Sequence, residues 1–562
     1  MRFWLEKIFE AKRYLFKNEQ PLWIYLVCGS FGLRLLLGEM QGYFIAANGY
    51  HDDILMIRYS QLIEHFINHN LPPQDLLVKD MGFPLILRFV KFTGIPYSAM
   101  MSLLWFFSAL LMVALVRVLT EEKNLWRDLA VFVFVLFAPV AFEYTGTRIY
   151  RNSAMAQMYF IALSMMSIFF VWHFIKPRVT PRVLVAFNVV FGLAFTLTYY
   201  IKEDGIWLLG CLLAVMFVCF VRIILSGEQI LPRVALLMIP LIIFAGSTVA
   251  YKGVNKICFG VYLINNRTEG ELGNFLKLIY KIKSDERTGS VWAPTDALNQ
   301  AFNASKTLRE NSALKEAVWH TGWFKKDIEK NPIQGDFLGW VMLSELYNSG
   351  TCHTLREQEE FLGKVNAELE AAFDANILQR DDRFQLVSSM GGMTKEEIFS
   401  LFPAMLLEYK AYITLHHVEP NRERQNMDNA GTLKLASRAL RMNLSKYTEP
   451  RFSTETANAF LKKLFAVYSV VQGVLFIAAL LGVIFGICTI RQKIFSVNEY
   501  LMLAIASGSL LLSLVYAFAI SWFCKFLDVL NVIFYGVGLV PMLTLFEIFG
   551  TYLLYRMCKN KL

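Results

Sequence analysis

Acidic residues lie a short way after the first long apolar block of the chain. His51-Asp52-Asp53 forms a short acidic motif, and Arg58 follows it by about one to two helical turns. A carboxylate in this position can take a proton from an attacking hydroxyl, and its neighbour can hold a cation. The alternative is that one aspartate caps a helix while the other is solvated.

Cationic residues lie in two later polar segments, 144–152 and 202–205. Arg148 and Arg151 belong to the first segment, and Lys202 precedes Glu203 in the second. The planar guanidinium group of arginine fits phosphate, which lies at the depth of lipid headgroups, and Lys202 could hold a second phosphate oxygen. The alternatives are arginines that snorkel to the headgroups and a lysine that anchors a helix end.

Two further cations need an explanation. Lys79 opens the stretch Lys79-Asp80-Met81-Gly82-Phe83-Pro84, whose glycine and proline suit a turn back toward the membrane. Lys79 could face a phosphate or be a solvated loop lysine. Arg34 lies inside the first apolar block, where a charge needs a partner, and we expect one of the two motif aspartates or Glu39.

Long apolar blocks separate these polar segments. The chain is 56% hydrophobic and only 18% charged, whereas a soluble protein carries about 25% charged residues. A helix that spans a bilayer needs about 20 mostly apolar residues. The sequence therefore predicts about ten transmembrane helices, at 21–37, 98–119, 126–143, 153–173, 183–201, 206–224, 233–250, 464–489, 498–521 and 530–554.

The distribution of lysine and arginine predicts the topology. The N-terminal segment, alternate short loops and the C-terminal tail are basic, which places both termini in the cytoplasm. Residues 82–95 are too short to cross and fit a re-entrant or surface-lying helix. The outer face then carries 38–97, 144–152, 202–205, 251–463 and 522–529, so the candidate residues should gather there.

The resulting fold class is an all-α polytopic membrane protein of the cell membrane with an extracytoplasmic domain. We expect an N-terminal membrane domain at 1–250 with about seven transmembrane helices and a first outer loop at 38–97. A mostly helical extracytoplasmic domain follows at 251–463, with helices at 335–348 and 356–373. A C-terminal membrane segment at 464–562 contributes about three more transmembrane helices.

Other functional classes find little support in the sequence. The net charge of +9 arises largely from the short loops that set topology, so nucleic acid is not expected as a partner. The adjacent His416 and His417 are poorly placed to share a metal, and no metal site is predicted. Pairing of Cys258 with Cys352 stays open. Tryptophans of the extracytoplasmic domain could bind carbohydrate or fill its core.

The order of the first motifs resembles the first-loop pattern of the GT-C glycosyltransferases, multispanning enzymes that use polyprenyl-phosphate-linked sugars. The residues that carry this resemblance are Gly32-Leu33-Arg34-Leu35-Leu36-Leu37, then His51-Asp52-Asp53, then Lys79-Asp80-Met81-Gly82-Phe83-Pro84-Leu85. Segments 148–152 and 202–205 look like those of a group of uncharacterised bacterial membrane proteins with this layout. The chain departs from the family pattern in its Asp-Asp pair, where Asp-Glu is more usual, and in the mid-chain position of its large insertion.

The resemblance implies a GT-C-like fold and an inverting transfer of a sugar from a lipid carrier on the outer side. Asp52 or Asp53 would be the catalytic base, and Arg148, Arg151 or Lys202 would hold the donor phosphate. Membrane lipid, the polyprenyl-phosphate carrier and a glycan or glycolipid acceptor would be the partners. No cofactor is assigned, and a divalent cation stays open.

Two other functions stay open at this stage. One is a carrier or flippase for a lipid-linked or anionic solute, for which polar or broken helices near mid-membrane would be expected. The other is a non-catalytic scaffold or sensor with an external binding domain. The enzyme hypothesis requires that Asp52, Asp53, Arg148, Arg151 and Lys202 come together at one outward cavity.

Overall fold

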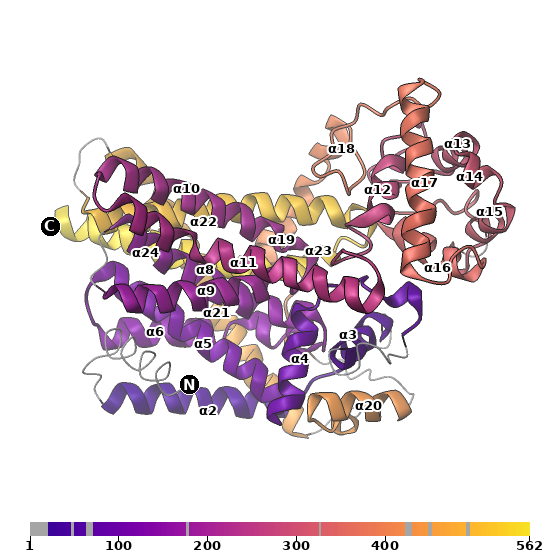
Figure 1. Cartoon of the computed structure of the whole chain (residues 1–562). Coiled ribbons are helices and arrows are strands. Elements are labelled where there is room, and N and C mark those ends of the chain that lie inside the picture. The colour runs from indigo at the N-terminus through magenta and orange to yellow at the C-terminus, as the bar shows by residue number, and fades with distance from the viewer. Residues whose placement is uncertain are drawn as a thin grey trace.

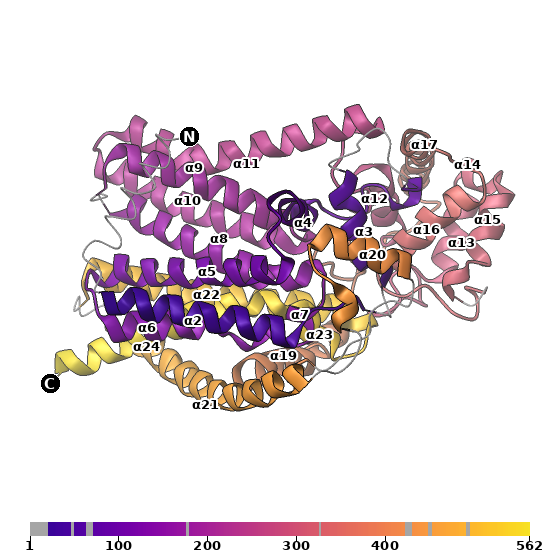
Figure 2. The same ribbon diagram turned by 90° about the horizontal axis from the view of Figure 1, so that it is seen from below.

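The computed structural model describes residues 21–46, 50–62, 71–175, 179–324, 327–421, 430–447, 452–490 and 495–561. Within these ranges, nine helices are long and apolar enough to cross a membrane. Figures 1 and 2 show them side by side in one bundle, so the chain is a polytopic helical membrane protein. The nine helices are α2 (Pro21–Gln41), α5 (Tyr97–Thr120), α8 (Arg151–Phe174), α9 (Pro181–Tyr199), α10 (Ile206–Ser226), α11 (Ile230–Phe259), α21 (Phe452–Thr489), α22 (Val497–Phe523) and α24 (Leu539–Lys561).

The span expected at 126–143 is not one continuous helix. Helix α6 (Leu125–Leu136) has 12 residues and is followed by η2 (Pro139–Ala141) and α7 (Tyr144–Thr147). Pro139 disfavours helical backbone in the residue before it, which accounts for the early end of α6. The broken segment still returns the chain to the end of the bundle that holds Phe44, whose N–H donates to the carbonyl of Thr147 at 3.2 Å.

Helix ends follow the capping residues of the sequence. Thr180 caps α9 through its side chain, with Pro181 in the first helical position. Ser496 and Glu499 form a reciprocal capping box at the start of α22. Gly227, at a φ of 66°, ends α10 in the left-handed conformation that glycine adopts without strain. The loops between the spans are therefore fixed at their junctions with the helices.

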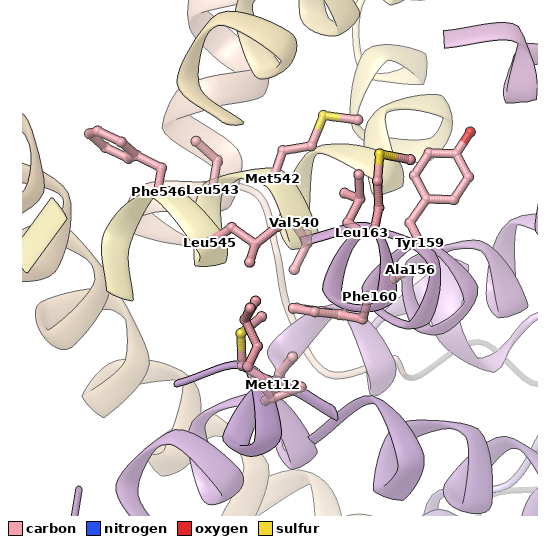
Figure 3. Packing of buried hydrophobic residues seen from close by; sticks show 14 of the residues in the cluster. Met112, Ala156, Tyr159, Phe160, Leu163, Val540, Met542, Leu543, Leu545 and Phe546 are labelled. Carbon is pink, nitrogen blue, oxygen red and sulfur yellow. The ribbon is translucent and has the colours of Figure 1, made fainter. Parts of the chain in front are cut away.

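The centre of the bundle is a continuous apolar core. Figure 3 shows buried side chains of α5, α8 and α24 directed toward one another, among them Met112, Phe160 and Leu545. Between helices in lipid, close packing replaces the hydrophobic effect as the main attraction. Gly482 of α21 illustrates this closeness, because an added Cβ would lie 1.9 Å from the carbonyl oxygen of Gly550 in α24.

A second body of short helices stands at one end of the bundle (Figure 1). The predicted helices at 335–348 and 356–373 are confirmed as α16 and α17, and buried leucines of α17 such as Leu362 and Leu369 face the core of this body. Its elements are α12 (Gly270–Ile279), α13 (Thr295–Ala304), α14 (Lys306–Arg309), α15 (Ser312–Trp319), η4 (Gly322–Phe324), α16 (Phe337–Asn348), α17 (Leu355–Asp374) and α18 (Lys395–Phe399). Cys258 and Cys352 are free thiols.

The boundaries expected for this domain, 251 and 463, fall inside helices. Helix α11 continues to Phe259, and α21 begins at Phe452. Helix α19 (Phe402–Thr414) packs against the membrane helices α21 and α22, while α20 (Ala430–Leu440) packs against α3 and α4. We therefore use the name end domain for residues 260–399, which form the body outside the bundle.

The polar segments converge where the bundle meets the end domain. Backbone contacts join them: Gly82 donates to the Tyr200 carbonyl at 2.7 Å, and Asn266 donates to the Leu77 carbonyl at 2.6 Å. The start of α2 and the end of α24 lie at the opposite end of the bundle. The remaining elements of the junction are α3 (Tyr50–Leu62), η1 (Pro73–Asp75), α4 (Gly82–Thr93), η3 (Glu203–Gly205), η5 (Leu444–Tyr447), η7 (Cys524–Phe526), α23 (Asn531–Tyr535) and η8 (Gly536–Gly538).

The contact between Gly82 and Tyr200 gives a test of this junction. A Cβ at Gly82 would lie 2.3 Å from the Tyr200 carbonyl oxygen, so Gly82→Ala must push two backbone segments apart. We expect a loss of about 2 kcal/mol in the free energy of unfolding of the purified chain in detergent. Gly210→Ala is the matched control, because nothing lies within 4 Å of its added Cβ. Equal unfolding midpoints for the two variants would contradict the close contact.

Candidate functional site

The two motif aspartates are adjacent on α3 but occupy different environments. Asp53 is fully buried and forms a bidentate ion pair with Arg148. The Nη2 atom of Arg148 lies 2.9 Å from Oδ1 of Asp53, and its Nε lies 3.1 Å from both oxygens. The backbone N–H of Ala46 donates to Oδ2 at 3.0 Å. Burial raises the pKa of Asp53 to about 6 although Arg148 opposes the shift, so the carboxyl is ionised at neutral pH. Asp53 thereby fixes α3 to the 144–152 segment.

Asp52 is the accessible member of the pair. Its side chain is 34% exposed, and Lys79 Nζ lies 3.2 Å from Oδ1. The hydroxyl of Tyr150 donates to Oδ2 at 3.4 Å. Burial opposes ionisation of Asp52, but Lys79 and Arg151 outweigh it and hold the pKa of Asp52 below its usual value. Asp52 is therefore a carboxylate that a molecule from outside can reach.

Lys79 is buried rather than solvated, which excludes the loop-lysine alternative. Its side chain is only 4% exposed and lies between Asp52 and the ring of Trp340, whose centroid is 4.9 Å from Nζ. Burial lowers the pKa of Lys79 to about 8, with Asp52 acting in the opposite direction. Lys79 is thus a cation at neutral pH that loses its charge at moderately basic pH.

Arg151 and Glu203 form the next pair of the cluster. Arg151 Nη1 donates to Glu203 Oε2, and Arg151 Nε donates to the hydroxyl of Tyr150 at 2.9 Å. Asn265 of the end domain bridges two acids, with Nδ2 at 3.3 Å from Glu203 Oε1 and 3.1 Å from Asp80 Oδ1. Burial and the nearby Glu203 raise the pKa of Asp80 to about 7. Asp80 is thus the acid of this group that gains a proton most easily.

Lys202 is paired with Asp204, two residues along the chain. Its Nζ is 2.9 Å from Asp204 Oδ2 and 4.9 Å from the centroid of the Tyr535 ring. The hydroxyl of Tyr516 in α22 also donates to Asp204 Oδ2, at 3.2 Å. Lys202 therefore links η3 to the C-terminal helices and is part of the cluster.

The end domain adds residues that sequence reasoning missed. Arg267 is paired with Asp336 and lies over Trp340, with Cζ 4.3 Å from the ring centroid. Asn265 and Arg267 follow the observed end of α11 at Phe259, but the span predicted there ends at residue 250, so the sequence offered no signal for them. Arg267 Nε is buried and has no hydrogen-bond partner among the described residues, which leaves one N–H available for an acceptor.

Each cation of the cluster contacts an acid, and in four of the five pairs the acid is the more exposed partner, most clearly in three of them. Side-chain exposure is 34% for Asp52, 24% for Glu203 and 26% for Asp336, whereas their cationic partners are between 4% and 13% exposed. The accessible side chains of the cluster are therefore mainly acidic, and its cations are buried. The five pairs are Lys79–Asp52, Arg148–Asp53, Arg151–Glu203, Lys202–Asp204 and Arg267–Asp336.

Two predicted cations lie elsewhere. Arg58 is exposed on α3, on a different side of the helix from the two aspartates. Arg34 is buried in the bundle with its guanidinium 4.1 Å from the ring centroid of Phe142 and 5.6 Å from that of Trp105. Of the acids expected as partners of Arg34, the two motif aspartates are wrong, because those carboxylates are held by Lys79 and Arg148, while pairing with Glu39 stays a prediction.

An apolar cavity of about 410 Å³ lies next to the cluster, between α3, α4, α9 and α11. Leu77 and Met81 line it, and these residues flank Lys79 and Asp80 in the chain. The cavity therefore adjoins the charged cluster through one segment of backbone, but none of the five residues that the enzyme hypothesis requires at one cavity lines it: Asp52, Asp53, Arg148, Arg151 and Lys202. The other lining residues are Tyr59, Leu62, Gly82, Leu85, Leu193, Thr196, Leu197, Tyr200, Ser247, Ala250, Tyr251, Val254, Asn255 and Phe259.

Comparisons with known proteins found no match among family models, curated proteins or solved structures. Within the described ranges, no group of three or more His, Cys, Asp or Glu side chains is arranged to hold a metal ion. The chemistry of the site is therefore argued from its own residues: one accessible carboxylate, several buried cations and an adjoining apolar cavity.

Because Asp53 and Arg148 form a buried ion pair, we expect a change at Asp53 to lower the stability of the fold and not only the activity. Asp53→Asn leaves the buried guanidinium of Arg148 without its counter-charge, which costs about 3–5 kcal/mol. We expect a corresponding fall in the unfolding midpoint of the purified chain in detergent. The double variant Asp53→Asn with Arg148→Gln should recover part of this loss because no charge stays unpaired. Wild-type stability of Asp53→Asn would refute the structural role of the pair.

Proposed function

We propose that this chain is an integral membrane glycosyltransferase that moves a sugar from a polyprenyl-phosphate-linked donor to a glycan or glycolipid acceptor. The reaction takes place at the junction of the bundle and the end domain, which we place on the extracytoplasmic side. The observation that carries the proposal is the accessible carboxylate of Asp52 above the buried cations Lys79, Arg151 and Arg267, beside an apolar cavity.

Asp52 is the proposed catalytic base. The acceptor hydroxyl attacks the anomeric carbon, the bond from that carbon to the phosphate oxygen breaks, and the polyprenyl phosphate leaves with the electron pair. The hydroxyl proton goes to Asp52, whose carboxylate is ionised and partly exposed. Asp53 does not serve as the base in this scheme, because its side chain is fully buried and is held by the bidentate contact with Arg148, whereas Asp52 is partly exposed.

The buried cations stabilise the leaving group. Negative charge grows on the departing phosphate, and fixed cations in a site of low dielectric stabilise such charge most effectively. Arg267 has an unused N–H, and Arg151 and Lys79 are neighbours in the same cluster. The donor phosphate competes with Asp336 and Glu203 for these cations, so binding of the donor exchanges one set of ion pairs for another.

The apolar cavity suits the isoprenoid part of the donor. Its volume of about 410 Å³ is within the range of small-molecule sites, and α9 and α11, which form part of its wall, are membrane-spanning helices. Because Leu77 and Met81 flank Lys79 and Asp80, a chain held in the cavity has its phosphate end near the cluster.

The base assignment is tested by Asp52→Asn. This change keeps the shape of the side chain but removes the proton acceptor, so we expect sugar transfer to fall by about 100-fold or more. Transfer of label from the lipid-linked donor pool to envelope glycan is measured in membranes of the source cell. Glu316→Gln, at an exposed acid of the end domain, is the control and should leave transfer unchanged. Full transfer by a folded Asp52→Asn protein would remove Asp52 from the mechanism.

The pKa of Lys79 predicts a basic limit of activity. Lys79 is charged below about pH 8 and neutral above it, so the cation beside Asp52 and the donor phosphate is lost as pH rises through 8. We expect the transfer rate to fall over this range. Arginine stays protonated throughout, so Lys79→Arg should move the fall to higher pH, whereas Lys79→Met should reduce transfer below about pH 8 to the level that wild type reaches above it. A basic limb that is identical in wild type and Lys79→Arg would exclude Lys79 as its source.

A further inference from the structure

Two tryptophans of the end domain form a stacked pair beside the charged cluster. Trp323 of η4 and Trp340 of α16 have ring centroids 6.3 Å apart and ring planes 24° apart. Trp323 is 48% exposed. Trp319, four residues earlier, behaves as a core residue instead, since it is buried and contacts Phe302 with centroids 5.0 Å apart. The exposure of Trp323 is therefore not a general feature of this segment.

Trp340 connects the exposed ring to the candidate base. Arg267 and Lys79 lie over Trp340, with distances of 4.3 Å and 4.9 Å to the ring centroid. Lys79 in turn contacts Asp52. Cations over an indole ring hold it in place, so Trp340 has a fixed orientation against which Trp323 stacks. A molecule on the ring of Trp323 is thus connected to Asp52 through Trp340 and Lys79.

One carboxylate is linked to this aromatic pair through a cation: Asp336 pairs with Arg267, whose guanidinium lies over the ring of Trp340. Asp336 directly precedes α16, which carries Trp340, and it is partly exposed like Asp52. A carboxylate has several lone pairs, so it can accept hydrogen bonds from hydroxyls while it contacts a cation. An aromatic face accompanied by a carboxylate matches a pyranose ring, which presents apolar C–H groups on its faces and hydroxyls at its rim. A lipid chain offers no donors for this carboxylate.

We propose that Trp323 and Trp340 form an acceptor subsite, in which a pyranose ring of the glycan stacks on Trp323 while its hydroxyls donate to Asp336. This inference rests on the proposed function, and it adds the location and chemical class of the acceptor. In this scheme a hydroxyl of the bound acceptor reaches Asp52, which is connected to the tryptophan pair through Lys79.

The test measures sugar binding without catalysis. Oligosaccharides released from the envelope of the source cell and separated by size are mixed with the purified full chain. Saturation-transfer NMR then detects which sugar protons contact the protein. For wild type we expect transfer to C–H protons of a pyranose ring. Trp323→Ala should weaken binding about tenfold or more, and Trp323→Phe should retain part of it. Trp126→Ala, at a tryptophan 69% exposed on α6, is the matched control and should bind as wild type.

The outcomes separate this inference from the proposed function. No saturation transfer from any fraction, or binding equal in wild type and Trp323→Ala, would overturn the subsite. Binding that depends on Trp323 in a chain whose Asp52→Asn variant transfers sugar normally would support the subsite and reject the proposed base. Because Trp323 is exposed, its replacement leaves the core of the end domain intact.

Discussion

The junction of this protein depends on one constraint: charges placed at the edge of a membrane bundle must be paired when they are buried. An isolated buried charge costs several kcal/mol, so each cation here contacts an acid, and all but Lys202 contact an acid from another part of the chain. Arg148 joins the 144–152 segment to α3, Lys79 joins the first polar loop to α3, and Arg267 joins two parts of the end domain. The ion pairs therefore hold together segments that are far apart in the chain.

This pairing separates two adjacent aspartates by role. Asp53 faces inward and is saturated by Arg148 and a backbone N–H, which makes it a structural residue. Asp52 is turned one position around the helix and meets solvent, so it retains capacity for a substrate. The same arrangement gives the site an acidic, accessible rim above a cationic base. A donor phosphate requires cations, and a sugar hydroxyl requires a proton acceptor. The buried cations and the exposed carboxylates supply these two kinds of group.

Sequence patterns predicted the positions of the spans and the convergence of the polar loops better than they predicted which side chains pair with each other. Apolar block length and capping residues indicate where helices lie, because backbone hydrogen bonds in lipid must be made locally. Pro139 broke the span expected at 126–143, and α11 and α21 extended past their predicted ends. Partners such as Arg267 and Asp336 depend on how the end domain docks, which has no periodic signal in the sequence. The sequence predicts an acidic partner for Arg34, whereas in the structure its guanidinium lies over the ring of Phe142.

The most direct test of the account is a structure of the full chain with a bound polyprenyl phosphate. We predict that the phosphate contacts Arg267 together with Lys79 or Arg151, with the first isoprenoid units in the cavity lined by Leu77 and Met81. The acidic partners of these cations should have moved away from them. A phosphate bound away from this cluster, or a cavity closed to the isoprenoid chain, would contradict the proposal that sugar transfer occurs at this junction.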